Sequence, residues 1–248
     1  MAPVRGGSEQ LRFVHALCVM QIPGLPFKAR SLQFLRQLLA PERRNTCVAA
    51  ARRVSPELKQ LQEAHPGRLV LTHVDVADES SISDWAKGLA EQGTKLDVVI
   101  NNAGVYGPRS QQLDSMTRDI VLDVFTTNAL GPLLVVQQLR RQRVLKRPAL
   151  VANVTSKMGS VDDNTSGACY AYRASKSALN IMTKSMAIDL APEGVTCVLL
   201  HPGYVRTPMT GGAGLIDVDA SVGGMISVLE TRELSGRWYA FDGKEIPW

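Results

Sequence analysis

The sequence has few cysteines and few aromatic residues, and neither group is arranged as a recognisable site. Aromatic residues make up 5% of the 248 residues, and the cysteines are Cys18, Cys47, Cys169 and Cys197. No Cys-x-x-Cys pair is present, and His201 has no neighbouring ligands that would complete a metal set. The spacing indicates neither a zinc site nor a disulfide framework. We therefore expect no metal, and free thiols in a reducing, cytoplasmic compartment.

A large excess of charge of one sign is also missing. The 28 basic and 23 acidic residues give a formal net charge of +5, too small and too dispersed to predict a nucleic-acid surface. The basic cluster at 140–147 is typical of a helix end, where cations suit the helix dipole. No run is long and apolar enough to cross a membrane. The run Phe13–Met20 contains His15 and lacks a small-residue cleavage site, so it predicts a strand and no export signal.

Short apolar runs alternate with longer segments of helical periodicity along the chain. The short runs lack the period-two alternation of half-exposed strands, which is typical of strands buried on both faces of a parallel sheet. The predicted strands are Phe13–Met20, Thr46–Ala51, Arg68–Val74, Leu96–Ile100, Ala149–Val154 and Val195–Leu200. The segments that carry apolar residues three or four apart are Leu32–Leu39, Ile82–Leu89, Ile120–Leu139 and Ala171–Leu190.

This alternation predicts a doubly wound α/β fold, with helices on both faces of one parallel sheet. With 45% hydrophobic and 21% charged residues, the chain is long enough for one domain with a well-buried core. Residues 1–10 form a polar tail that we expect to be disordered, and no linker divides the rest. We therefore expect a single domain over residues 11–248.

Polar residues follow three of the predicted strands, at the edge where open α/β sheets bind ligands. Asn101-Asn102-Ala103-Gly104 combines two amides, which can brace neighbouring strand ends, with small residues that let a flat ligand approach. Thr155 and Ser156 place hydroxyls after the next strand, and Pro202–Thr207 forms a stiff polar turn after the last one. We expect these segments to line one site.

Tyr172 and Lys176 are four residues apart in a predicted helix, so that one turn brings both side chains onto the same face. An ammonium beside a phenol favours the phenolate and lowers the pKa of the tyrosine, which makes it an acid/base candidate. Taken alone, such a pair is more often a solvated helix surface. The polar motifs at the strand ends favour a catalytic role for Tyr172 and Lys176.

The four motifs, in this order, resemble the short-chain dehydrogenase/reductase family over about residues 13–207. They are Asn101-Asn102-Ala103-Gly104, Ser156, Tyr172-x-x-x-Lys176 and Pro202-Gly203-x-Val205-x-Thr207. The last eleven residues, 238–248, look like the end of a C-factor-like or sniffer-like carbonyl reductase branch. The resemblance implies a Rossmann-type domain, hydride transfer between a carbonyl compound and an alcohol, and a homodimer or homotetramer formed through the helix of Tyr172.

The resemblance also implies a role for each of four catalytic residues. Tyr172 would be the acid/base at the substrate oxygen, Ser156 would hydrogen-bond that oxygen, and Lys176 would hold phenolate and nicotinamide ribose. Asn128 would kink its helix and hold a water in a proton relay, although it could instead be a helix amide bonded to the backbone. Thr155 is the alternative to Ser156. Tyr170 is the alternative to Tyr172, but Ala174 stands where its lysine would be.

The end of the second predicted strand favours NADP over NAD. It reads Ala51-Arg52-Arg53, with no carboxylate for the ribose hydroxyls, and Arg52 is in better register than Arg53 to meet the extra phosphate. By resemblance, Asp75 and Val76 would contact the adenine. The remaining implied cofactor contacts are Asn102, Ala103, Gly104, Tyr172, Lys176, Pro202, Gly203, Val205 and Thr207.

One expected element is missing: the glycine-rich turn that follows the first strand in this family. Residues 22–31 contain one glycine and two prolines in its place, so the aligned backbone N–H donors that hold a pyrophosphate are lost. Lys28 and Arg30 either compensate with charge or are solvated loop residues. Two hypotheses follow: an NADP-dependent carbonyl reductase, or a family member that binds dinucleotide weakly and acts through protein interaction.

Overall fold

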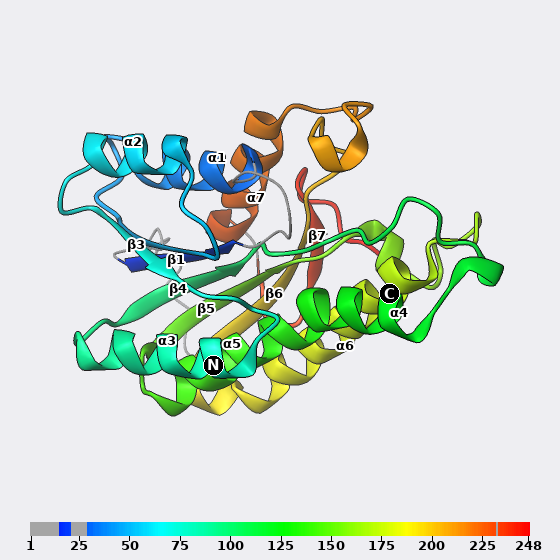
Figure 1. Ribbon diagram of the computed structural model, residues 1–248. Helices are drawn as coiled ribbons and strands as arrows, with labels where there is room; N and C mark the ends of the chain where they lie inside the picture. The colour runs from blue at the N-terminus through cyan, green and yellow to red at the C-terminus, as the bar shows by residue number, and fades with distance from the viewer. Residues whose placement is uncertain (1–14, 21–28, 232) are drawn as a thin grey trace, which may run out of the picture.

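A seven-stranded parallel sheet lies at the centre of the computed structural model, which describes residues 15–20, 29–231 and 233–248 (Figure 1). The strand order is β3-β2-β1-β4-β5-β6-β7, so the direction of winding reverses beside β1. The strands are β1 His15–Met20, β2 Thr46–Ala51, β3 Leu69–His73, β4 Leu96–Asn101, β5 Leu145–Val154, β6 Val195–His201 and β7 Trp238–Ala240. This is the predicted doubly wound Rossmann-type fold.

Helices cover both faces of the sheet, as each parallel crossover requires (Figure 1). One face carries α1 Ala29–Leu38, α2 Pro56–Ala64 and α7 Val218–Thr231. The opposite face carries α3 Glu79–Glu91, α4 Arg118–Phe125, α5 Gly131–Arg141 and α6 Tyr170–Asp189. Short 3-10 turns lie at Leu113–Ser115, Lys157–Gly159, Ala191–Glu193 and Pro208–Thr210.

Local sequence explains where several helices begin. Ser55 caps α2 through its hydroxyl, which accepts from the Leu58 N–H, and Pro56 supplies the first helical residue. Asp78 caps α3 by accepting from two backbone N–H groups, and Thr117 caps α4 by accepting from the Ile120 N–H. The cluster of arginines ends α5, with Arg140 and Arg141 in its last turn, as predicted.

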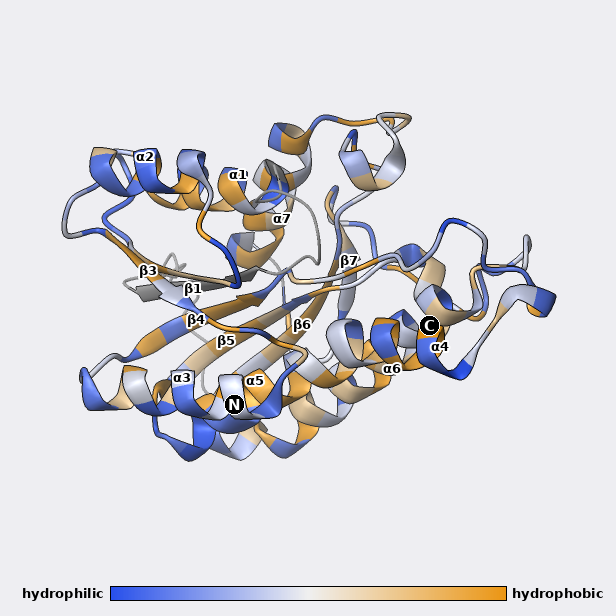
Figure 2. Ribbon diagram, in the orientation of Figure 1, coloured by the Kyte–Doolittle hydropathy of each residue, from blue (hydrophilic) through white to orange (hydrophobic). Residues whose placement is uncertain are grey.

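Two apolar layers hold the helices to the sheet, and the ribbon coloured by hydropathy shows the apolar sides of the helices turned inward (Figure 2). On one face Phe34 and Leu35 of α1 pack with Met225 of α7 over the strands. On the other face Trp85 of α3 and Val135 of α5 pack with neighbours from β4 and β5. Burial on both faces explains why the strands are continuously apolar.

The helix Ile120–Leu139 is longer and less regular than its sequence pattern predicts. α4 and α5 are joined without a break by a π-helical segment, Thr126–Leu130, which buries Thr127, Asn128 and Ala129. The prediction that no segment has the length and composition of a membrane span is wrong, because the 24-residue helix Arg118–Arg141 meets both criteria. It packs against α6 and α3, and 44% of its apolar window is buried inside the fold, as for a covering helix of the sheet.

Candidate functional site

The predicted strand-end motifs meet at one cavity of about 550 Å³, beyond the carboxyl ends of β4, β5 and β6. Open α/β sheets bind ligands at this edge. Ser156, Tyr172 and Lys176 all line the cavity. The predicted cofactor residues that line it with them are Asn102, Ala103, Gly104, Pro202, Gly203, Val205 and Thr207.

Tyr172 and Lys176 lie one turn apart in α6, and both side chains are buried. The Lys176 Nζ donates to the carbonyl oxygen of Val154 at 3.0 Å and lies 6.0 Å from the centroid of the Tyr172 ring. The backbone N–H of Tyr172 donates to Oε1 of Gln111 at 3.0 Å. The ring of Tyr106 packs on the ring of Tyr172, with 4.9 Å between their centroids. The pair is fixed from several directions, unlike a solvated helix surface.

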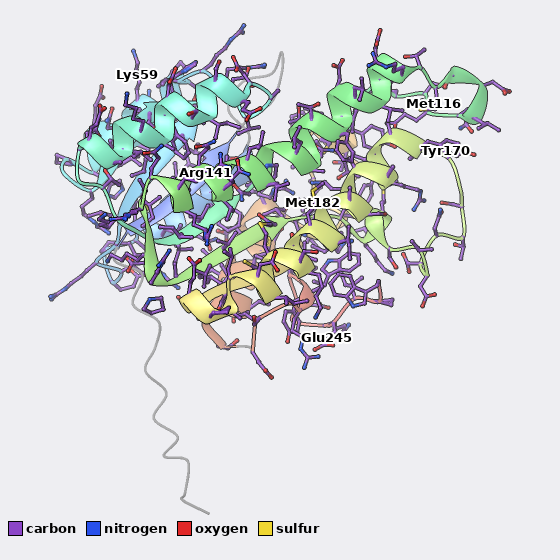
Figure 3. The ribbon with its side chains drawn as sticks, turned by 90° about the horizontal axis from the view of Figure 1, so that it is seen from below. Lys59, Met116, Arg141, Tyr170, Met182 and Glu245 are labelled. Carbon is purple, nitrogen blue, oxygen red and sulfur yellow. The ribbon has the colours of Figure 1, made fainter. Side chains whose placement is uncertain are left out.

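Ser156, at the end of β5, hydrogen-bonds with the Tyr172 side chain, which brings the two predicted acid/base and oxyanion groups together. The alternative at Thr155 is disfavoured because the Thr155 hydroxyl donates to Oδ1 of Asn180 at 2.6 Å. The alternative at Tyr170 is disfavoured because that side chain is exposed at the outer end of α6 (Figure 3). Ser156 and Tyr172 therefore place two mutually hydrogen-bonded hydroxyls in the lining of the cavity.

Asn128 lies behind the cavity in the π-helical segment, fully buried. Its Oδ1 accepts from the Val105 N–H at 2.8 Å, and its Nδ2 donates to the Val105 carbonyl at 2.8 Å and to Oγ of Ser175 at 3.0 Å. Asn128 is thus an amide bonded to the backbone of Val105 and to the side chain of Ser175, a geometry that both of its predicted roles allow. Its contacts tie the loop after β4 to α6, while the proton-relay role stays a prediction.

Burial dominates the electrostatics of Tyr172. It raises the pKa of the hydroxyl, while the hydrogen bond with Ser156 and the charge of Arg30 act in the opposite direction. This net direction is the reverse of the one predicted from the Tyr172/Lys176 spacing. Burial, with a smaller contribution from Arg30, lowers the pKa of Lys176 to about 7. A protonated Tyr172 therefore faces the cavity at neutral pH, as a proton donor.

The side chains after β4 brace the strand ends. The Asn101 Nδ2 donates to Oδ1 of Asn153 on β5 at 2.8 Å, as expected for paired strand-end amides. Asn102 is turned toward α1, where its Nδ2 donates to Oγ of Ser31 at 2.7 Å. After β6, Gly203 has φ +79°, and a side chain there would collide with Ile216 and Phe241.

Arg52, Asp75 and Val76 lie apart from the described lining of this cavity, at the ends of β2 and β3. The Arg52 guanidinium lies 3.6 Å from a carboxylate oxygen of Asp75, and both side chains are about one quarter exposed. Val76 is buried beside Gly131, the first residue of α5. The structure thus brings together the three residues predicted to contact the adenosine half.

Arg30 is a site residue whose position the sequence did not settle. Most of the atypical segment, 22–28 with Lys28, lies outside the described residues, but α1 begins at Ala29, three residues earlier than predicted. The Arg30 Nε donates to Oδ1 of Asn102 at 2.8 Å, and the side chain lines the cavity. The alternative that Arg30 is a solvated loop charge is wrong.

Other lining or supporting residues carried no motif. His201 ends β6, lines the cavity, and has its pKa lowered to about 4 by burial, so it is neutral at pH 7. The Tyr106 hydroxyl lies 2.9 Å from Sγ of Cys169, and Tyr106 lines the cavity. Gln111 holds the loop by donating to the Tyr106 carbonyl at 2.7 Å. The one signal in the sequence that could have identified His201 as a site residue is its position at the end of a predicted strand.

A family model described as short chain dehydrogenase matches residues 37–214, which is more than half of the chain. The chain belongs to the short-chain dehydrogenase family. It is therefore an oxidoreductase by family, and the matched region holds all four predicted catalytic residues. The match begins after the atypical segment 22–31.

Several proteins that resemble this chain in sequence or structure are short-chain dehydrogenases or carbonyl reductases. The C-signal of Myxococcus xanthus is 47% identical over 158 residues, covering 62% of this chain and 93% of that protein. The NADPH-bound carbonyl reductase from chicken fatty liver is 31% identical, with a TM-score of 0.82, over 95% of this chain and all of that one. Carbonyl reductase Sniffer of D. melanogaster, at 25% identity, has a TM-score of 0.83 over the same shares. The predicted family branch is confirmed.

Proposed function

We propose that this short-chain dehydrogenase reduces a carbonyl compound to an alcohol with NADPH, and that Tyr172 supplies the proton. The observation that carries the proposal is the assembly of Tyr172, Ser156 and Lys176 at one cavity whose walls are the ends of β4, β5 and β6. A raised tyrosine pKa favours the protonated phenol, which a reductase needs at its substrate oxygen.

In the reductive direction Tyr172 donates its hydroxyl proton to the substrate oxygen as that oxygen gains charge. Ser156 donates a hydrogen bond to the same oxygen and so lowers the energy of the developing alkoxide. NADPH, when bound, supplies the hydride. Lys176 lies behind the phenol, where its ammonium stabilises the phenolate left after proton transfer.

The residues present fit a dinucleotide at both ends. The small residues Ala103 and Gly104 line the cavity beside Lys176, and a side chain at Gly104 would lie 3.2 Å from Oδ1 of Asn128, a tight contact. Arg52 and Asp75 lie at the strand ends on the other side of β1, where they would hold the phosphorylated ribose and the adenine. The NADPH-bound and NADP-bound structural neighbours support this choice of cofactor.

Turnover by matched variants tests the proposal. The purified chain should oxidise NADPH when given a panel of aldehydes and ketones, measured by loss of the absorbance of the reduced nicotinamide. Tyr172→Phe should lower kcat by about 10²–10⁴-fold and leave NADPH affinity nearly unchanged, because it removes only the proton donor. Tyr170→Phe is the control on the exposed side of α6 and should retain full activity. Retained turnover by Tyr172→Phe would refute the assigned role.

The atypical segment supports a second candidate function, in which the chain keeps the fold but binds dinucleotide weakly and acts through a protein partner. Two prolines within 22–31 remove backbone donors that a pyrophosphate would need. Saturable NADPH binding in the micromolar range would exclude this candidate. Absence of binding at millimolar NADPH would favour it over the reductase.

We also propose a homodimer or homotetramer in the cytoplasm. α4 and α6 pack side by side, and Met182 marks the middle of α6 in Figure 3. Ile181 and Ile188 of α6 are 62% and 64% exposed. Such an apolar face is typical of an interface between subunits. A monomer mass measured by light scattering would refute the proposed oligomer.

The proposed cytoplasmic location is supported by the buried thiols of Cys47 and Cys197, which suit a reducing compartment.

A further inference from the structure

Arg30 adds a positive charge to the lining of the catalytic cavity. It lies in the first turn of α1, and its Nε donates to Oδ1 of Asn102 at 2.8 Å while Ser31, its neighbour, accepts from Nδ2 of the same amide at 2.7 Å. Asn102 thus clamps this turn to the end of β4. The side chain is half-buried and lines the cavity with Tyr172 and Lys176.

The described lining of this cavity holds several cations and no carboxylate. Arg30, Lys176, Arg109 and Lys157 contribute basic side chains, and among the lining residues that the structure describes none is Asp or Glu. Lys157 pairs with Asp163 at 2.9 Å, so its charge is partly balanced. The positive charge of Arg30 has no carboxylate beside it in this lining.

The charge of Arg30 reaches every titratable group that the proposed chemistry uses. It contributes to the lowered pKa of Lys176, opposes the raised pKa of Tyr172, and contributes to the lowered pKa of His201. Arginine remains protonated at neutral pH even when burial lowers its pKa. A guanidinium held this way offers planar N–H donors suited to a phosphate or a carboxylate.

We propose that Arg30 is an oxyanion-binding residue of the catalytic cavity, which receives a phosphate of the dinucleotide or a carboxylate of the substrate. The inference rests on the proposed function for its dinucleotide source. A guanidinium would replace, with one charged side chain, part of what the missing glycine-rich turn does with backbone donors. The carboxylate source would instead restrict the substrate to carbonyl acids.

Three variants and four probes test the proposal by equilibrium binding. Arg30→Gln removes the charge, Arg30→Lys keeps the charge without the planar fork, and Arg36→Gln removes an exposed charge from the same helix as the control. The probes are NADPH, inorganic pyrophosphate, pyruvate, and methyl pyruvate, which lacks the carboxylate. Thermal unfolding of each variant confirms that it folds.

We expect Arg30→Gln to weaken binding of the anion that Arg30 receives by 10-fold or more, with Arg30→Lys intermediate and Arg36→Gln unchanged. A phosphate source predicts this loss for NADPH and pyrophosphate. A carboxylate source predicts it for pyruvate and no change for methyl pyruvate. Unchanged or tighter binding of all anions by Arg30→Gln would overturn the proposal, as would a wild-type chain that binds none of them.

Failure of the proposed function would look different. Suppose the wild-type chain binds pyrophosphate or pyruvate through Arg30 and does not bind NADPH. That result would contradict the proposed reductase and support the oxyanion site. If the wild-type chain binds NADPH and turns over, but Arg30→Gln leaves every affinity unchanged, the reductase stands and the oxyanion site fails. A separate readout is the pKa of Lys176, which Arg30→Gln should raise because it removes a neighbouring positive charge.

Discussion

A lysine one turn from a tyrosine does not by itself make a phenolate. In this chain Lys176 gives its hydrogen bond to the Val154 carbonyl and stays 6.0 Å from the Tyr172 ring centroid, so burial decides the pKa of Tyr172. The cation that opposes this effect is Arg30, from the other side of the sheet. Sequence spacing predicted that the two side chains share one face of a helix, and both line the cavity from α6. The balance between burial and charge depends on tertiary neighbours that spacing does not contain.

Cofactor preference is tested at Arg52. Arg52→Gln should weaken NADPH binding by roughly tenfold and leave NADH binding nearly unchanged, because only NADPH carries the extra phosphate that the guanidinium would meet. The neighbouring exposed Arg53 provides the matched control, and Arg53→Gln should change neither affinity. Equal losses for both cofactors, or a larger effect at Arg53, would contradict the assignment of Arg52. Nucleotide fluorescence titrations give both affinities.

The elements that could be predicted from sequence are those whose burial alone defines them. β2 occupies the predicted residues 46–51, and β6 extends the predicted run by only one residue, since strands buried on both faces are continuously apolar. α2, α7 and β7 were not predicted. α2 buries only Leu58, α7 contains two glycines, and β7 has three residues, so each has too weak a periodicity to identify.

The part of the candidate site that lies at strand ends could be predicted wherever the strand itself could be predicted. Ser156 and the residues after β4 and β6 follow strand ends, and their meeting at one edge follows from parallel topology. Tyr172 lies in the first turn of α6, where its spacing from Lys176 makes it a candidate. Arg30 was not predictable in this way. Its position depends on where α1 begins and on Asn102, 72 residues away, which no local pattern encodes.

The junction between α6 and the turn after β5 is tested at Gly159. An added Cβ there would lie 2.8 Å from the backbone carbon of Lys176 and 3.0 Å from the nitrogen of Ser177, so α6 would have to move. We expect Gly159→Ala to lower the free energy of unfolding by about 1–3 kcal/mol and to reduce turnover, because Lys176 and Tyr172 shift together. Denaturant unfolding and kcat measure both effects.

Gly88 in α3 supplies the matched control for this substitution. An alanine side chain there meets nothing within 4 Å, so Gly88→Ala should leave turnover unchanged and stabilise the fold by up to about 1 kcal/mol. If Gly159→Ala behaves like Gly88→Ala, the close packing of α6 on this turn is not what positions Lys176.

At the scale of the whole molecule, a buried lysine links stability to pH. The pKa of Lys176 falls from an ordinary 10.5 to about 7 on folding, so between these values the unfolded chain binds a proton that the folded chain does not. Its contribution therefore favours folding increasingly as pH rises through this window. Below about pH 7 the folded chain holds a buried ammonium at full cost.

Replacing Lys176 by Met should remove this slope. The free energy of unfolding of the wild-type chain should rise between pH 7.5 and 9.5 (the inner part of that window) more steeply than that of Lys176→Met, by up to ~1.4 kcal/mol per pH unit. Lys184→Met, an exposed lysine further along α6, controls for the loss of a charge. Parallel pH profiles for the wild-type chain and Lys176→Met would contradict the shifted pKa.

Hydride transfer by this protein requires that a chain without the glycine-rich turn still binds a dinucleotide. The direct measurement is a titration of the purified chain with NADPH, followed by nucleotide fluorescence, with NADH in parallel. We predict saturable binding of one NADPH per chain, tighter than that of NADH, because Arg52 favours the extra phosphate. Absence of saturable binding at millimolar NADPH would contradict an NADPH-dependent reductase, however complete the group of Tyr172, Ser156 and Lys176 is.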